Sequence, residues 1–135
     1  HRDAASSVTF VTGHEQRDKK KNSVNWRKLA KSSDNLVIYM GIRNIKFIVQ
    51  ELILGGLDQH TKCAVIQEAT LKNQKCIIVE LANLIDKIKD QQYLSPSIII
   101  IGKIVDFKVN NTITKLSEVY LSEINQVQLY NNFQK

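Results

Sequence analysis

The sequence lacks any long hydrophobic run. Apolar residues make up 43% of the 135 residues, yet a buried stretch such as SIIIIGKIV (97–105) is far shorter than the roughly 18–20 apolar residues of a membrane span. The first residues, HRDAASS, lead into no apolar core of the kind that defines a signal peptide. We therefore expect neither a membrane anchor nor a secretory signal.

Cysteine and histidine are scarce. The two cysteines, Cys63 and Cys76, each stand in an apolar run, KCAVI and KCIIV, which is typical of buried free thiols in a reducing compartment. The expected location is the cytoplasm, or the stroma or matrix of an organelle; a disulfide between the two is the open alternative. The histidines (His1, His14 and His60) are scattered, and none has metal-ligand spacing with another ligand. No metal site is predicted.

Several common functional motifs are also absent. The sequence contains no Walker loop, no GxGxxG, no GxSxG and no HExxH, so a catalytic constellation complete within this chain is not expected. The net charge is +6, which suits a polyanionic partner. The densest basic run, RDKKKN (17–22), lies in a polar stretch without a zinc-knuckle or aromatic RNA-binding motif. This pattern favours a solvated loop over a nucleic-acid patch.

The periodicity of the apolar residues predicts an α/β fold, a mixed sheet flanked by helices. Strands are predicted at 7–13, 35–40, 63–70, 74–81 and 97–105. The fourth is expected to be an antiparallel or mixed-sheet neighbour of the third, and the fifth a central strand. Helices are predicted at 25–31, 43–56 and 80–92, the second with an apolar stripe of Ile45, Ile48, Val49 and Leu52. Residues 35–40 are apolar on both sides, as in a strand covered by helices on both faces. Asn25 or Ser23 is expected to cap the first helix and Asn44 the second.

Small and polar residues gather where the predicted strands end. They are Thr12-Gly13-His14, Met40-Gly41, Glu68-Ala69-Thr70 and Gly102. In open α/β sheets, ligands bind in crevices at such strand ends. The alternative is that each small residue only turns the chain.

Five blocks, in this order and spacing, carry a resemblance to a known family. They are HRD…SVTFVTGHE, NW..LA, NLVIYMGI, AVIQEAT…Q and SPSIIIIGKIV, and together they resemble the second half of the tetrapyrrole methylases. The resemblance implies that residues 1–105 form the C-terminal domain of that fold. Residues 106–135 are then a polar C-terminal extension with a helical pattern. The N-terminal catalytic half, with its glycine-rich motif, is expected to be absent from this chain.

Within the family, the blocks are most similar to the members that methylate uroporphyrinogen III. The implied reaction takes methyl groups from S-adenosyl-methionine and gives precorrin-2, the precursor of sirohaem and cobalamin, with no metal. The substrate's eight carboxylates agree with the basic balance of this chain. No catalytic residue is expected here, and the complete enzyme is expected to be a homodimer.

The resemblance also assigns site residues. Met40, Gly41, Ala69 and Thr70 match positions that bind the cofactor. A flexible thioether at Met40 suits packing against adenine and ribose, a glycine at Gly41 lets the backbone approach closely, and a small residue at Ala69 exposes backbone groups. The alternative for Met40 is a place in the core.

Arg2 and His14 are the candidates for substrate binding, as part of a basic rim. Arg2 could equally tie the domain junction, and His14 could cap a strand end. Two other functions stay open. One is a methyltransferase of the same fold that acts on a later corrin precursor, a protein or RNA. The other is a non-catalytic half-domain used for assembly.

Overall fold

The computed structural model describes residues 6–13 and 24–106. Arg2, His14 and the extension from residue 107 onward lie outside the described residues, so their predicted roles stay predictions. No helix in these two ranges is long and apolar enough to cross a membrane.

The order of strands and helices agrees with the predicted order. The described residues form β1 (Val8–Thr12), α1 (Trp26–Ser32), β2 (Asn35–Tyr39), α2 (Ile45–Leu54), β3 (Lys62–Gln67), β4 (Lys75–Glu80), α3 (Leu84–Asp90) and β5 (Ser97–Gly102). Short 3-10 turns precede α2 and α3, and a further one, Lys103–Asp106, follows β5.

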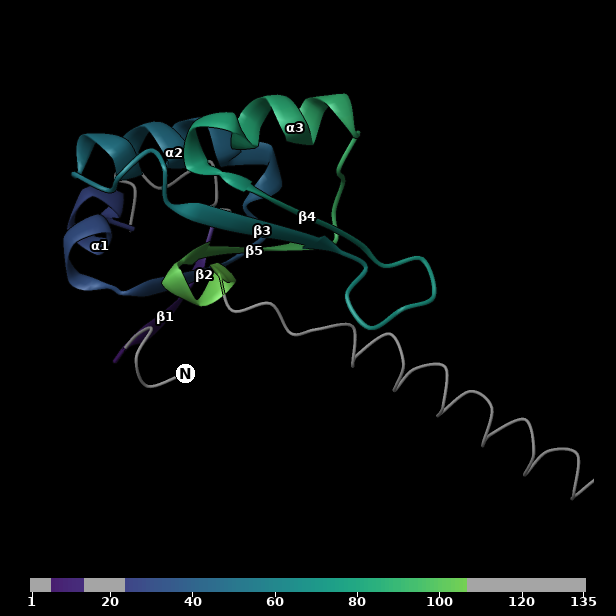
Figure 1. The fold of residues 1–135 in the computed structure, drawn as a ribbon, viewed down its shortest axis with the longest axis horizontal. Helices are drawn as coiled ribbons and strands as arrows, with labels where there is room; N and C mark the ends of the chain where they lie inside the picture. Colours follow the sequence, from purple (N-terminus) through teal and green to yellow (C-terminus); the bar gives the residue numbers. More distant parts are fainter. Residues whose placement is uncertain (1–5, 14–23, 107–135) are drawn as a thin grey trace, which may run out of the picture.

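The strands form one mixed five-stranded sheet with the order β1-β2-β5-β3-β4 (Figure 1). β1 and β2 are parallel, and the other neighbouring pairs are antiparallel. The prediction that residues 97–105 supply a central strand is confirmed, because β5 lies between β2 and β3. The prediction that 74–81 is a neighbour of 63–70 is confirmed as well, and the two strands are antiparallel.

All three of these helices pack on one face of the sheet. On that face Leu36 is opposite Ile101 and Ile38 is opposite Ile99, and each of the four is at most 2% exposed. They form one cluster with the inner faces of the helices. The predicted stripe of α2 is confirmed, since its buried residues are Ile45, Ile48, Val49 and Leu52.

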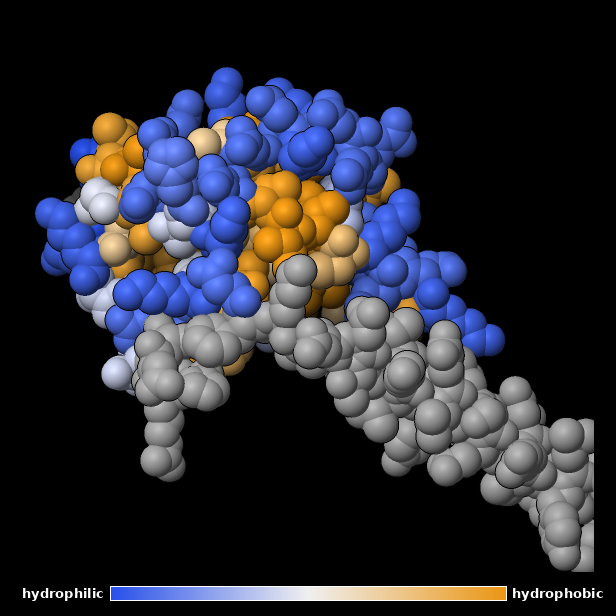
Figure 2. All heavy atoms as spheres, viewed as in Figure 1, coloured by the Kyte–Doolittle hydropathy of each residue, from blue (hydrophilic) through white to orange (hydrophobic). Residues whose placement is uncertain are grey.

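The opposite face of the sheet is exposed mainly at its two edge strands, β1 and β4, whereas Asn35 and Ala64 on the same face are 1% and 7% exposed. Val8 is 53% exposed, Phe10 67% and Ile78 52%. In Figure 2, hydrophobic atoms lie over the strands beneath the hydrophilic shell of α2 and α3. The expectation that residues 35–40 are covered on both faces is wrong at the end of this stretch, where Tyr39 is 42% and Met40 58% exposed.

The two predicted helix caps have different outcomes. Asn25 caps α1, its side-chain oxygen accepting the Lys28 N–H at 3.0 Å. Asn44 does not cap α2 with its side chain; Asn44 Nδ2 instead donates to the carbonyl oxygen of Gly13 at 2.7 Å. The prediction for Asn44 was wrong because the 3-10 turn Ile42–Asn44 leads directly into α2, so Asn44 lacks the extended backbone of a capping residue.

Two further predictions are corrected at β4. Cys63 is buried as predicted, but Cys76 is exposed, because β4 is an edge strand and Cys76 points to the open face. Both thiols are free. Glu80 ends β4 instead of lying on a helix. Its carboxylate contacts His60 Nδ1 at 3.0 Å and Lys62 Nζ at 3.3 Å. The hydrogen bond between Glu80 and His60 raises the pKa of His60.

Candidate functional site

Three of the four predicted strand ends lie at the same edge of the sheet. β1 and β2 are parallel with Thr12 beside Tyr39, and β5 begins at this edge because Tyr39 is opposite Ile98. β3 ends there too, with Gln67 opposite Ser97. Gly102 is at the other edge, opposite Asn35. Its inclusion in the predicted set was wrong because β5 runs antiparallel to both neighbours.

A cleft of roughly 380 Å³ lies at this edge. That volume is within the range of about 300–1,000 Å³ for small-molecule sites. Its walls are mostly apolar and come from the ends of β2, β3 and β5 and from the following turns: Tyr39, Met40, Ile66, Glu68, Ala69, Leu71, Ser95, Pro96, Ser97 and Ile98. Among the described residues of this lining, Glu68 is the only charged one.

Met40 contributes to the cleft from the turn after β2. Its side chain is 58% exposed, so it is not a core residue. Its φ is +53°, in the left-handed region that residues other than glycine rarely adopt. The preceding Tyr39 stacks on Phe10 with ring centroids 6.4 Å apart. The stacking places a rigid aromatic wall beside the mobile thioether.

Gly41 packs against the core and does not line the cleft. A Cβ at this position would lie 2.8 Å from Ile38 Cγ2 and 3.1 Å from Ile99 Cδ1. On its other side, the Gly41 backbone is in contact with Gly13. Gly13 N–H also donates to the Tyr39 carbonyl oxygen at 2.7 Å. The close approach at Gly41 is thus one between two strand ends, and its role toward a ligand stays a prediction.

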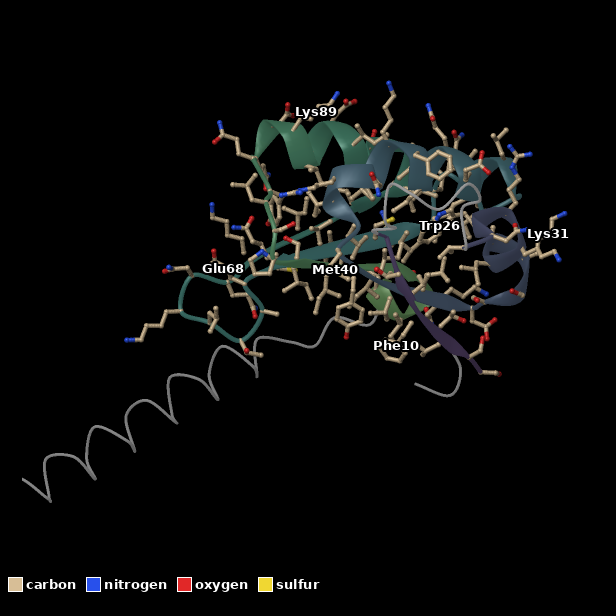
Figure 3. The ribbon with its side chains drawn as sticks, turned by 180° about the vertical axis from the view of Figure 1, so that it is seen from behind. Phe10, Trp26, Lys31, Met40, Glu68 and Lys89 are labelled. Atoms are coloured by element: carbon tan, nitrogen blue, oxygen red, sulfur yellow. The ribbon has the colours of Figure 1, made fainter. Side chains whose placement is uncertain are left out.

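Ala69 lies on another wall of the cleft, in the turn that follows β3. Its neighbours Glu68 and Thr70 have φ values of +51° and +70°. Thr70 is exposed beside the cleft and is not part of its lining. Backbone held in the left-handed region by residues other than glycine clusters at ligand sites. Met40 and Glu68 lie toward the same edge of the sheet in Figure 3.

The remaining wall is the segment that leads into β5, which the sequence analysis did not assign to the site. Glu68 N–H donates to the Pro96 carbonyl oxygen at 3.1 Å, so this segment borders the Ala69 turn. Gln67 Oε1 accepts the Leu94 N–H at 2.8 Å. The Ser95-Pro96 peptide bond is cis. The available signal was the SPS block before an apolar strand, since an antiparallel β5 must begin where β2 and β3 end.

The chemistry of the cleft is that of binding. As far as the structure describes the chain, its lining has no histidine, cysteine or lysine. In the described ranges, no group of three or more histidine, cysteine, aspartate or glutamate side chains could hold a metal. The apolar walls suit a flat ring, and the left-handed turns at Met40 and Glu68 present backbone groups to a ligand.

Comparison with known families identifies the fold. The family model of Tetrapyrrole (Corrin/Porphyrin) Methylases matches residues 1–85. The chain belongs to the tetrapyrrole methylase family. This membership confirms the resemblance seen in the sequence blocks.

Relatives with curated names are similar to this tetrapyrrole methylase chain but longer. A uroporphyrinogen-III C-methyltransferase of Synechocystis sp. is 38% identical over 110 residues, which are 82% of this chain and 42% of that protein. A siroheme synthase of Hahella chejuensis is 37% identical over 108 residues, which are 80% of this chain and 23% of that protein. The chain thus spans less than half the length of these relatives.

A solved structure supports the fold. The uroporphyrin-III C-methyl transferase of Thermus thermophilus, complexed with S-adenyl homocysteine, has a TM-score of 0.65 and 20% identity. The similarity covers 80% of this chain and 47% of that one. The mixed sheet with helices is therefore a tetrapyrrole methylase architecture, as predicted.

Proposed function

We propose that this chain is the C-terminal part of an S-adenosyl-methionine-dependent methyltransferase that converts uroporphyrinogen III to precorrin-2. One observation carries the proposal. Met40 and Ala69, which the sequence blocks assign to cofactor binding, come from different strand ends and line a single cleft.

The residues of the cleft fit a nucleoside. Met40 and Tyr39 offer an adaptable apolar surface and a rigid one for the adenine and ribose. Ala69 leaves its backbone accessible, because its side chain is only a methyl group. When bound, the cofactor supplies a sulfonium methyl, which a pyrrole carbon attacks while the electron pair of the broken carbon–sulfur bond stays on sulfur. The chain's own contribution is to hold the two reactants in line.

Among the described residues, the lining of the cleft contains no histidine, cysteine or lysine. We therefore propose that a first domain closes it and brings the residues for proton removal. A homodimer of the complete enzyme and a reducing compartment, the cytoplasm or an organellar stroma or matrix, belong to the same proposal. Arg2 and His14 remain its candidates for the basic rim that meets the substrate's carboxylates.

The test uses a chimera in which the first half of the Synechocystis enzyme is joined to this chain. Incubation with S-adenosyl-methionine and uroporphyrinogen III should give a product with two added methyl groups, as seen by mass spectrometry. The unmodified Synechocystis enzyme is the positive control. A folded chimera that binds the cofactor but leaves uroporphyrinogen III unmethylated would refute this substrate. It would favour a later corrin precursor, a protein or RNA.

A further inference from the structure

The turn that carries Ala69 has an unusual backbone. The residues on both sides of Ala69, Glu68 and Thr70, have positive φ values of +51° and +70°. Neither is glycine, so the turn needs interactions that hold it in the left-handed region. These interactions decide which backbone groups at Ala69 face the cleft.

Backbone hydrogen bonds account for most of the turn. Leu71 N–H donates to the Glu68 carbonyl oxygen at 3.0 Å, and Gln74 N–H donates to the Leu71 carbonyl oxygen at 3.0 Å. Glu68 N–H reaches across to Pro96. These bonds fix the two ends of the turn. None of them involves Thr70, the left-handed residue that follows Ala69.

The N–H of Thr70 donates instead to a side chain. Its acceptor is Gln74 Oε1, at 2.7 Å. Gln74 directly precedes β4, so its side chain connects the tip of the turn to the sheet. Gln74 and Thr70 are both exposed, and loss of the amide oxygen would leave the core untouched.

We propose that Gln74 is a positioning residue for the candidate site. Its side-chain oxygen holds Thr70 in the left-handed conformation and thereby sets the direction of the Ala69 backbone in the cleft. The functional part of this inference rests on the proposed nucleoside site. The structural part, the control of the turn by Gln74, stands on the hydrogen bond alone.

The first experiment measures amide hydrogen exchange by NMR in the full chain. A net hydrogen bond is worth about 0.5–1.5 kcal/mol, so Gln74→Ala should speed exchange at Thr70 about two- to tenfold. Gln74→Glu should behave like the wild type because a carboxylate also accepts from an N–H, whereas Gln74→Lys has no acceptor and should behave like the alanine variant. Gln50→Ala, at an exposed position of α2, is the matched control and should change nothing. Unchanged exchange at Thr70 in Gln74→Ala would overturn the proposal.

The second experiment measures the affinity of the chimera for S-adenosyl-homocysteine by calorimetry. Gln74→Ala should weaken binding by a similar factor of about two to ten, and Gln74→Glu should restore it while the melting temperature stays constant. Equal affinities of the Gln74→Ala and Gln50→Ala chimeras would overturn the functional part. If the unsubstituted chimera does not bind, the nucleoside site itself fails, and the exchange data at Thr70 still decide whether Gln74 controls the turn.

Discussion

Substitution of Met40 tests whether this residue belongs to the site or to the core. Met40 is 58% exposed, so less than half of its surface contributes to burial. Complete burial of a methionine side chain stabilises a fold by about 1.5–3 kcal/mol. Met40→Ala should therefore lower the free energy of unfolding by roughly 1 kcal/mol. The melting temperature should fall by about 4–8 °C, the usual shift per kcal/mol in a domain of this size.

The backbone at Met40 provides a second variant. Its φ of +53° is costly for any residue with a Cβ, by about 1–2 kcal/mol, and glycine avoids that cost. Met40→Gly should therefore be at least as stable as Met40→Ala. Leu52, which is fully buried, is the matched control, since Leu52→Ala should cost about 2–5 kcal/mol.

Urea denaturation followed by circular dichroism measures all three variants in this chain. The chimera then gives their affinities for S-adenosyl-homocysteine, which both Met40 variants should weaken far more than they weaken the fold. A stability loss in Met40→Ala as large as that in Leu52→Ala would show that Met40 is a core residue. Normal affinity in a stable Met40→Ala chimera would remove the residue from the site.

Three further predictions address the other residues. In the chimera, Ala69→Leu should abolish cofactor binding without changing the circular dichroism spectrum, and Ala69→Gly should bind the cofactor normally. Normal binding by the leucine variant would show that Ala69 faces away from the ligand. Gly41→Ala should destabilise the chain by about 1–3 kcal/mol in urea because the added methyl lies 2.8 Å from Ile38 Cγ2; a wild-type midpoint would contradict this packing. Iodoacetamide should modify the exposed Cys76 in the native chain but reach Cys63 only after unfolding, because burial raises the pKa of the Cys63 thiol to about 12. Mass spectrometry of the alkylated peptides measures both reactions, and rapid alkylation of Cys63 in the native chain would contradict its burial.

Local patterns predicted the helices and strands well. The stripe of α2 repeats at helical spacing, and each of its four members is buried, because one face of a helix beside a sheet has no access to water. Asn25 caps α1 through an interaction that spans only three residues. In both cases, the residues that determine the structure lie close together in the sequence.

The full order of the strands, and the features that depend on it, could not be predicted in the same way. The sequence does not show that β5 enters the sheet between β2 and β3. That insertion brings Pro96 to the cleft and sends Gly102 to the opposite edge. Cys76 resembles Cys63 in its local sequence, and only the edge position of β4 exposes it.

The candidate site was predicted only in part, because some of its features also depend on how the strands pair. Met40 and Ala69 came from sequence blocks, and the structure places both in one cleft. Gly41 came from the same blocks, but its surroundings are set by Gly13 and Ile99, which pack against it only in the folded chain. The hydrogen bond from Thr70 N–H to Gln74 depends on left-handed backbone that residue types other than glycine do not signal.

The central claim is that this chain supplies one wall of a cofactor site that a first domain completes. Isothermal titration calorimetry with S-adenosyl-homocysteine tests it most directly, on this chain alone and on the chimera under the same conditions. The chimera should bind saturably, and the isolated chain should show no measurable binding. Micromolar binding by the isolated chain would contradict it.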